Sequence, residues 1–223
     1  MRWPWQPRTD WYAQRGEDRT LAALLGRRRR GFYIDVGAWD PVQDSVTKHF
    51  YDRGWRGINV EPHPYYSTLL RAARPRDITL PIALGDAPGE LDLLVIGHTG
   101  LATFEPAVAD YAAAWAAEHR HWETGIETVR VPVSTLAAVC RAHVPAGTEI
   151  DFLKIDVEGW EERVLRGADW TVYRPRILCI EAVDPLRETP SWEPWDALVQ
   201  AQDYDLLDFD GLNRWYRRRE VST

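Results

Sequence analysis

The stretch GFYIDVGAWD, residues 31–40, decides the fold. Its apolar and β-branched residues run directly into Gly37, which predicts a buried strand that ends in a tight glycine turn. Outward from this strand the pattern alternates between strand and helix. The next segments are a helix at 42–53, a strand at 57–61, a helix at 64–73 and a strand at 78–84 whose Pro81 indicates an edge or an end. Such alternation predicts a parallel sheet with right-handed crossovers.

The rest of the chain extends this α/β pattern to its end. We predict further strands at 91–96, 127–133, 150–156 and 176–181, a closing antiparallel hairpin at 204–217, and helices at 107–122, 134–143, 159–165 and 192–201. Ser134 is a candidate helix cap. We expect one domain over residues 1–223, with helices on both faces of the sheet and a lid-like helical insertion at about 98–126. Tyr111 and Trp115, four residues apart, give the inserted helix a possible stacking face.

Composition excludes several classes of protein. The net charge of −7 argues against a nucleic-acid partner, and no apolar run approaches the length of a transmembrane helix. The first residues lack the apolar core of a signal peptide, so we expect a cytoplasmic protein. The two cysteines are expected as buried thiols and are too few for a cysteine zinc site. The basic runs at 27–30 and 217–219 are either solvated ends or contacts for an anionic partner. Nothing in the sequence predicts an oligomeric state.

Acidic residues follow every predicted strand of the parallel sheet. In open α/β sheets, ligands bind beyond the carboxyl ends of the strands, so these side chains are candidates for a site. Helix capping is the alternative explanation for any one of them. The acidic candidates, in chain order, are Asp35, Asp40, Glu61, Asp86, Asp156, Glu158, Glu181 and Asp184.

The turn at Gly37 and the acid at Glu61 indicate a nucleoside-containing cofactor. Gly37 allows a ligand to approach the backbone, and Glu61 is placed to accept the ribose hydroxyls. An NAD site would use G-x-G-x-x-G to hold a pyrophosphate. Here the turn has one glycine and an acid, Asp40, which suits the ammonium and sulfonium of S-adenosylmethionine better. An NAD-dependent oxidoreductase or epimerase is the alternative.

Five blocks of the sequence resemble, in order, those of the FkbM family of methyltransferases. The blocks are AQRGED at 13–18, FYIDVGA at 32–38, FYDRGWRG at 50–57, VEPHP at 60–64 and DFLKIDVEGWE at 151–161. The resemblance implies a class I methyltransferase with a mostly parallel seven-stranded sheet, which uses S-adenosylmethionine and methylates hydroxyl groups. It also implies cofactor contacts at Asp35, Gly37 and Glu61, with Asp86 near the adenine. Gln14 and Glu17 would close over the cofactor.

The resemblance also bears on the acceptor side, where two residues depart from the family pattern. Trp39 and Trp160 are larger than the family pattern has there, so we expect them to narrow the acceptor pocket. The expected reaction is O-methylation of a sugar, a glycan or a sugar-bearing metabolite; a catalytically silent module in glycan assembly is the alternative from another class.

Asp156 and Glu181 should end neighbouring strands and activate the hydroxyl. Two carboxylates at that distance either share a proton or hold a divalent cation such as Mg²⁺. Glu158 or Asp184 would assist, although Asp156 or Glu158 could instead cap the next helix. Lys154 is expected either to pair with an acid or to act in catalysis.

The histidines have less specific interpretations. His49 is expected to pack in the core, whereas His63 is either a contact near the ribose or a structural residue. His119 and His121 do not share a helix face and are not expected to bind a metal.

Overall fold

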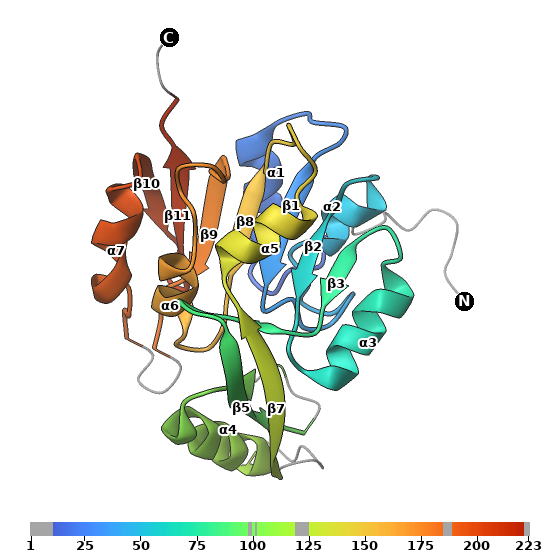
Figure 1. Ribbon diagram of the computed structural model, residues 1–223, viewed down its shortest axis with the longest axis vertical. Helices are drawn as coiled ribbons and strands as arrows, with labels where there is room; N and C mark the ends of the chain where they lie inside the picture. Colours follow the sequence, from blue (N-terminus) through green and yellow to red (C-terminus); the bar gives the residue numbers. More distant parts are fainter. Residues whose placement is uncertain (1–10, 98–99, 101, 119–124, 185–188, 221–223) are drawn as a thin grey trace.

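A seven-stranded sheet forms the body of the protein (Figure 1). The computed structural model describes residues 11–97, 100, 102–118, 125–184 and 189–220. The strand order is β10-β11-β9-β8-β1-β2-β3, with β11 antiparallel to both neighbours and the other pairings parallel. This order confirms the predicted sheet with its closing hairpin. The bounds are β1 (Phe32–Val36), β2 (Arg56–Val60), β3 (Ile78–Leu80), β8 (Phe152–Ile155), β9 (Ile177–Glu181), β10 (Tyr204–Phe209) and β11 (Asn213–Arg218).

Helices cover both faces of this sheet, as predicted. On one face α5 (Leu136–His143), α6 (Glu161–Arg166) and α7 (Glu193–Gln200) pack on alternate strand residues such as Ile34 and Leu153. On the other, α1 (Glu17–Leu25) and α2 (Lys48–Asp52) pack on Tyr33 and Phe152. All five residues of β1 are buried for this reason. Helix α3 (Pro64–Ala73) lies beside β3 (Figure 1).

A second, four-stranded sheet projects from one end of the main sheet (Figure 1). Its strands are β4 (Ala83–Leu84), β5 (Gly89–Ile96), β6 (Ala102–Thr103) and β7 (Ile126–Ser134), in the order β4-β7-β5-β6. Helix α4 (Pro106–Glu118) packs against it. The segments at 91–96 and 127–133 are therefore strands, as predicted, but they pair with each other outside the main sheet. The predicted insertion at about 98–126 lies partly outside the described residues.

Three predicted helix starts were wrong, and local hydrogen bonds explain two of the differences. The 42–53 helix is reduced to α2, because Asp40 Oδ1 accepts the N–H groups of Val42 and Gln43 in a turn. Thr135, not Ser134, caps α5 by accepting the N–H of Ala138. Helix α6 begins at Glu161 rather than at residue 159.

Several smaller expectations are confirmed. Strand β3 ends at Leu80, directly before Pro81, and it is an edge strand. Cys140 and Cys179 are buried free thiols. No helix within the described part of the chain is long and apolar enough to cross a membrane.

Candidate functional site

A cavity of about 720 Å³ lies at the carboxyl ends of β1, β2 and β8 and extends to the second sheet. Six of the seven predicted cofactor residues line it, as do three of the four predicted catalytic residues. The predicted residues in the lining are Gln14, Glu17, Asp35, Gly37, Asp40, Glu61, Lys154, Asp156 and Glu158.

Gly37 forms the turn at the centre of the cavity. Its φ is +76°, and a Cβ at this position would lie 1.8 Å from the carbonyl oxygen of Asp156. The N–H groups of Gly37 and Ala38 both donate to Val60 O, at 3.0 and 3.3 Å. The backbones that end β1, β2 and β8 therefore meet here, and only glycine fits both the space and the dihedral angle.

Glu61 lies buried directly after β2 and its carboxylate is held by the backbone. Oε2 accepts the N–H of Trp39 at 2.7 Å, and Oε1 accepts the N–H of His63 at 2.8 Å. Burial raises the pKa of Glu61 to about 7, although these two hydrogen bonds and the charge of Lys154 oppose the rise. Each oxygen keeps one further lone pair that a ligand hydroxyl can use.

Two histidines have structural roles. His63 caps α3, since its Nδ1 accepts the N–H of Tyr65, while its Nε2 lies 3.1 Å from Gly97 O. His63 is not part of the cavity lining. His49 stacks on Trp11 with ring centroids 4.0 Å apart, which confirms its predicted packing role. His119 and His121 lie outside the described residues.

Lys154 is a buried cation that joins three groups of the site. Its Nζ donates to Gly37 O at 2.7 Å and lies 3.3 Å from Asp156 Oδ2 and 3.6 Å from Asp35 Oδ1. Burial alone would lower the pKa of Lys154, but the two carboxylates outweigh it and raise the pKa. The side chain therefore stays charged, so it pairs with acids and does not offer a proton-accepting nitrogen.

Four acidic side chains gather at the ends of β8 and β9. Burial and the charges of neighbouring carboxylates raise the pKa values of Glu158, Glu161 and Glu181. For Glu181, burial is the largest cause, and Asp156 is the neighbouring carboxylate whose charge contributes most. Asp156 and Glu181 thus lie together, as their neighbouring strands predicted. A shared proton is the arrangement that such raised pKa values favour.

The capping explanation for Asp156 and Glu158 was wrong. Glu161 Oε1 accepts the N–H groups of Val157 and Gly159, at 3.1 and 3.3 Å, and so satisfies the turn before α6. Among the described residues, no side chain caps α6 at its first turn, and Asp156 and Glu158 both line the cavity.

Within the residues that the structure describes, no group of three or more His, Cys, Asp or Glu side chains is arranged to hold a metal ion. The tentative Asp156–Glu181 metal site therefore has no further protein ligand of these types. Carbonyl oxygens and water are the other ligands that Mg²⁺ accepts. The geometry gives no support to Mg²⁺.

Three predicted site residues lie outside the cavity lining. Asp86 pairs with Arg163 at 3.4 Å and its side chain is 46% exposed, so the structure does not place it at the cavity. Asp184 is also outside the lining, and its N–H donates to Thr189 O. Glu181 is not in the lining either, although the charges of Asp156, Glu158 and Glu161 all act on it.

The wall that faces the second sheet is mostly apolar and aromatic. Trp39 packs edge-on against Tyr66, and Trp160 packs against Phe104, with centroids 5.6 and 5.1 Å apart. Tyr111, on α4, is 43% exposed and lines the same space. The side chain of Trp115 lies outside the described part of the structure. Further residues of this wall include Leu84, Leu93, Ala102 and Val108.

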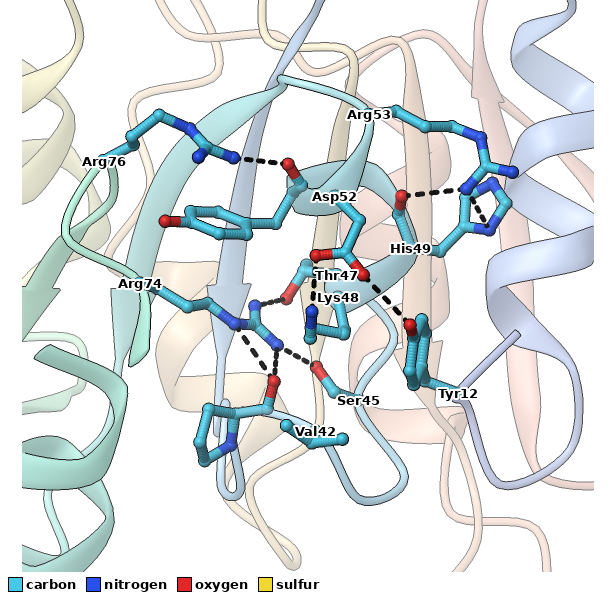
Figure 2. A network of polar contacts seen from close by, with 12 residues as sticks. Tyr12, Val42, Ser45, Thr47, Lys48, His49, Asp52, Arg53, Arg74 and Arg76 are labelled. Carbon is cyan, nitrogen blue, oxygen red and sulfur yellow. Dashed lines mark hydrogen bonds and ion pairs between the residues drawn. The ribbon is translucent and has the colours of Figure 1, made fainter. Parts of the chain in front are cut away.

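Sequence reasoning missed Glu161 and a buried arginine, Arg74. Arg74 ends α3 and its guanidinium reaches the segment at 41–47, where it donates to Ser45 and Thr47 (Figure 2). An arginine beside a proline at the end of a helix resembles any surface residue in the sequence. Only its 1% exposure in the fold reveals the role.

The domain model "Methyltransferase FkbM domain" matches residues 35–206, which is most of the chain. The chain belongs to the FkbM methyltransferase family. This membership confirms the predicted family and identifies the chain as a methyltransferase rather than an NAD-dependent oxidoreductase or epimerase.

Comparison with solved structures finds similar folds at low sequence identity. A TehB-like SAM-dependent methyltransferase from Corynebacterium glutamicum is 8% identical, with a TM-score of 0.47, and the match covers 91% of this chain and 88% of that one. An O-methyltransferase from Bacillus cereus in complex with SAH is 11% identical, with a TM-score of 0.42 and coverages of 93% and 81%. A fibrillarin/Nop5p complex is 11% identical, with a TM-score of 0.40 and coverages of 92% and 83%. No curated protein matches the chain.

Proposed function

We propose that this methyltransferase uses S-adenosylmethionine to methylate a hydroxyl of a sugar, a glycan or a glycosylated metabolite. The observation that carries the proposal is a single cavity that joins the Gly37 turn and Glu61 to the carboxylates of Asp156 and Glu158. A nucleoside-binding end and a proton-accepting end thus share one space. The volume of about 720 Å³ is within the range of cavities that hold small ligands.

The donor half of the cavity fits S-adenosylmethionine by its shape and by its charge. Gly37 leaves the backbone open to a ligand, and the two oxygens of Glu61 can each accept a ribose hydroxyl. Gln14, Glu17 and Asp40 border this half, and their acidic members suit an ammonium group. When bound, S-adenosylmethionine supplies a methyl group attached to a sulfonium.

The acceptor half fits a neutral molecule with an apolar face. Trp39, Trp160 and Tyr111 offer aromatic surfaces of the kind that pack on sugar rings. A hydroxyl held there would face Asp156, which would take its proton, while the nearby Glu181 favours its protonated form because burial and neighbouring carboxylates raise its pKa. Glu158, whose pKa is also raised, is the neighbouring group that could assist.

Titration calorimetry and a transfer assay test the proposal in turn. S-adenosylmethionine and S-adenosylhomocysteine should bind in the micromolar range, about 7–8 kcal/mol, while NAD should not bind. The protein should then transfer the methyl group of S-adenosylmethionine to members of a panel of neutral glycosides. Binding of NAD without S-adenosylhomocysteine contradicts the donor assignment. Tight donor binding with no transfer to any glycoside contradicts the acceptor and favours a silent binding module.

A further inference from the structure

A fully buried arginine holds the segment that leads from β1 to α2. Arg74 donates to Pro41 O from Nη2 at 2.6 Å and from Nε at 3.2 Å, to Ser45 Oγ at 2.5 Å and to Thr47 Oγ1 at 2.6 Å (Figure 2). All of these acceptors are neutral oxygens of residues 41–47. The fork of the guanidinium therefore fixes three points of one segment at once.

Thr47 connects this arginine to the cofactor end of β1. Its hydroxyl is fully buried and has one proton. Because Arg74 can only donate, the hydroxyl must accept from Arg74, and its own proton then points to Asp35 Oδ2 at 2.9 Å. The direction of both hydrogen bonds is thus determined without any knowledge of the hydrogen positions.

The connection continues from Asp35 across the site. Lys154 lies 3.6 Å from the other oxygen of Asp35 and reaches both Gly37 O and Asp156 Oδ2. Between Arg74 and Asp156 the contacts thus run through the guanidinium of Arg74, the hydroxyl of Thr47, the carboxylate of Asp35 and the ammonium of Lys154. The first four members are buried, whereas the side chain of Asp156 is 36% exposed at the cavity.

We propose that Thr47 is a positioning residue of the methyltransferase site. It orients Asp35, which in turn holds Lys154 against the Gly37 carbonyl and Asp156, so that the donor turn and the acceptor carboxylate are in place before ligands bind. The part of this inference that concerns ligand binding rests on the proposed function. Preorganisation of this kind reduces the free-energy cost of ordering the site when a ligand binds.

The segment itself gives Thr47 a second connection to the cavity. Gln43 and Asp44 belong to the cavity lining, and Asp44 pairs with Ala13 in an isolated parallel bridge. Ala13 precedes Gln14, which also lines the cavity. A change at Thr47 should therefore also shift Gln43, Asp44 and Gln14, which line the donor half.

Thr47→Val is the direct test because it keeps the shape of the side chain and removes the hydroxyl. It leaves a donor of Arg74 and an oxygen of Asp35 unsatisfied. We expect the variant to bind S-adenosylhomocysteine at least 10-fold more weakly than the wild type does. The affinity is measured well below the unfolding temperature of the variant. Thr47→Ser keeps the hydroxyl, so its affinity for S-adenosylhomocysteine should stay within about 3-fold of that of the wild type.

Tyr204→Phe is the matched control for lost stability. It removes a buried hydrogen bond of 2.6 Å to Pro175 O, in the strand farthest along the sheet from β3. Its unfolding temperature should fall as in Thr47→Val, with unchanged affinity. Equal affinity in Thr47→Val and Tyr204→Phe would show a merely structural threonine and overturn the proposal. If Thr47→Val does not fold, Thr47→Ala is judged by the same threshold.

Hydrogen exchange of the ligand-free protein separates this proposal from the proposed function. In Thr47→Val the amides of Gly37 and Ala38, which donate to Val60 O, should exchange at least 10-fold faster than in Thr47→Ser and Tyr204→Phe. A wild-type protein that does not bind S-adenosylhomocysteine contradicts the proposed function, and the exchange data then decide the positioning role alone. Unchanged exchange at both amides overturns it.

Discussion

Replacement of Glu61 by glutamine should separate cofactor binding from stability. Glutamine keeps the size of the side chain, but it has one accepting oxygen, whereas Glu61 accepts the N–H groups of both Trp39 and His63. One buried N–H then faces an amide NH₂, which costs about 1–3 kcal/mol. The opposing effect is that the glutamine variant avoids the cost of burying the charged carboxylate of Glu61. The rise of the pKa from 4.5 to about 7 corresponds to about 3 kcal/mol at high pH.

These opposing effects make the expected stability change depend on pH. Because the folded pKa of Glu61 is raised, its stabilising contribution is complete below about 4.5 and is lost as the pH rises through about 7. Above pH 7 the two effects nearly cancel, so Glu61→Gln should unfold at a temperature close to that of the wild type. Near pH 5 the variant should be less stable, since only the lost hydrogen bond remains.

Cofactor affinity should increase with pH, whereas the stabilising contribution of Glu61 decreases with pH. Ribose hydroxyls donate to the carboxylate, so binding to the wild type should strengthen as the pH rises from 6 to 8. Glu61→Gln should weaken S-adenosylhomocysteine by about 1.5–3 kcal/mol at pH 8, roughly 10- to 150-fold, and flatten this rise.

Scanning calorimetry at pH 5 and 8 measures the unfolding temperatures, and titration calorimetry at pH 6, 7 and 8 measures the affinity for S-adenosylhomocysteine. Glu162→Gln serves as the control, because Glu162 makes only a surface pair with Arg166. Wild-type affinity in Glu61→Gln, or an unchanged pH slope, would refute the ribose role.

Three further predictions concern the rest of the site. Asp156→Asn should reduce turnover on a genuine acceptor by about 10²-fold or more and change cofactor affinity far less. Full turnover in this variant would remove Asp156 from the mechanism. Wild-type activity that is abolished by EDTA and restored by Mg²⁺ would indicate a metal instead. The free energy of unfolding should fall as the pH rises above about 4.5, because Glu158, Glu161 and Glu181 have raised pKa values and favour the folded state when protonated; a rise over that range would contradict the buried cluster. Helix α4 should exchange amide hydrogens faster than β8 and slow down when ligands bind, whereas equal protection of the two without ligand would show an ordinary core helix.

Regular alternation made the main sheet predictable from the sequence. Strands such as 32–36 are buried on both faces, so their apolar runs are unambiguous, and the glycine turn after them follows from local geometry. The residues at the strand ends could be predicted for the same reason: the carboxyl ends of parallel strands meet at one edge. Asp35, Glu61 and Asp156 were found in this way.

Contacts between distant segments explain what the sequence did not predict. Residues 42–53 have a helical pattern, but the guanidinium of Arg74 binds the Pro41 carbonyl and the Thr47 hydroxyl, 33 and 27 residues earlier in the chain, and holds the segment in another conformation. Asp86 follows a strand as the other acids do, yet its short strand β4 belongs to the second sheet. Periodicity reports local structure and does not report which sheet a strand joins.

The second sheet has a consequence for how the enzyme can change. The donor contacts that we propose come from the ends of β1 and β2, whereas Leu93, Ala102 and Tyr111 of the opposite wall belong to β5, β6 and α4. The main sheet could therefore remain constant while residues 89–134 are exchanged between relatives as a cassette. New acceptors could then arise by recombination of this cassette, without any loss of the methyl-donor machinery during the transition.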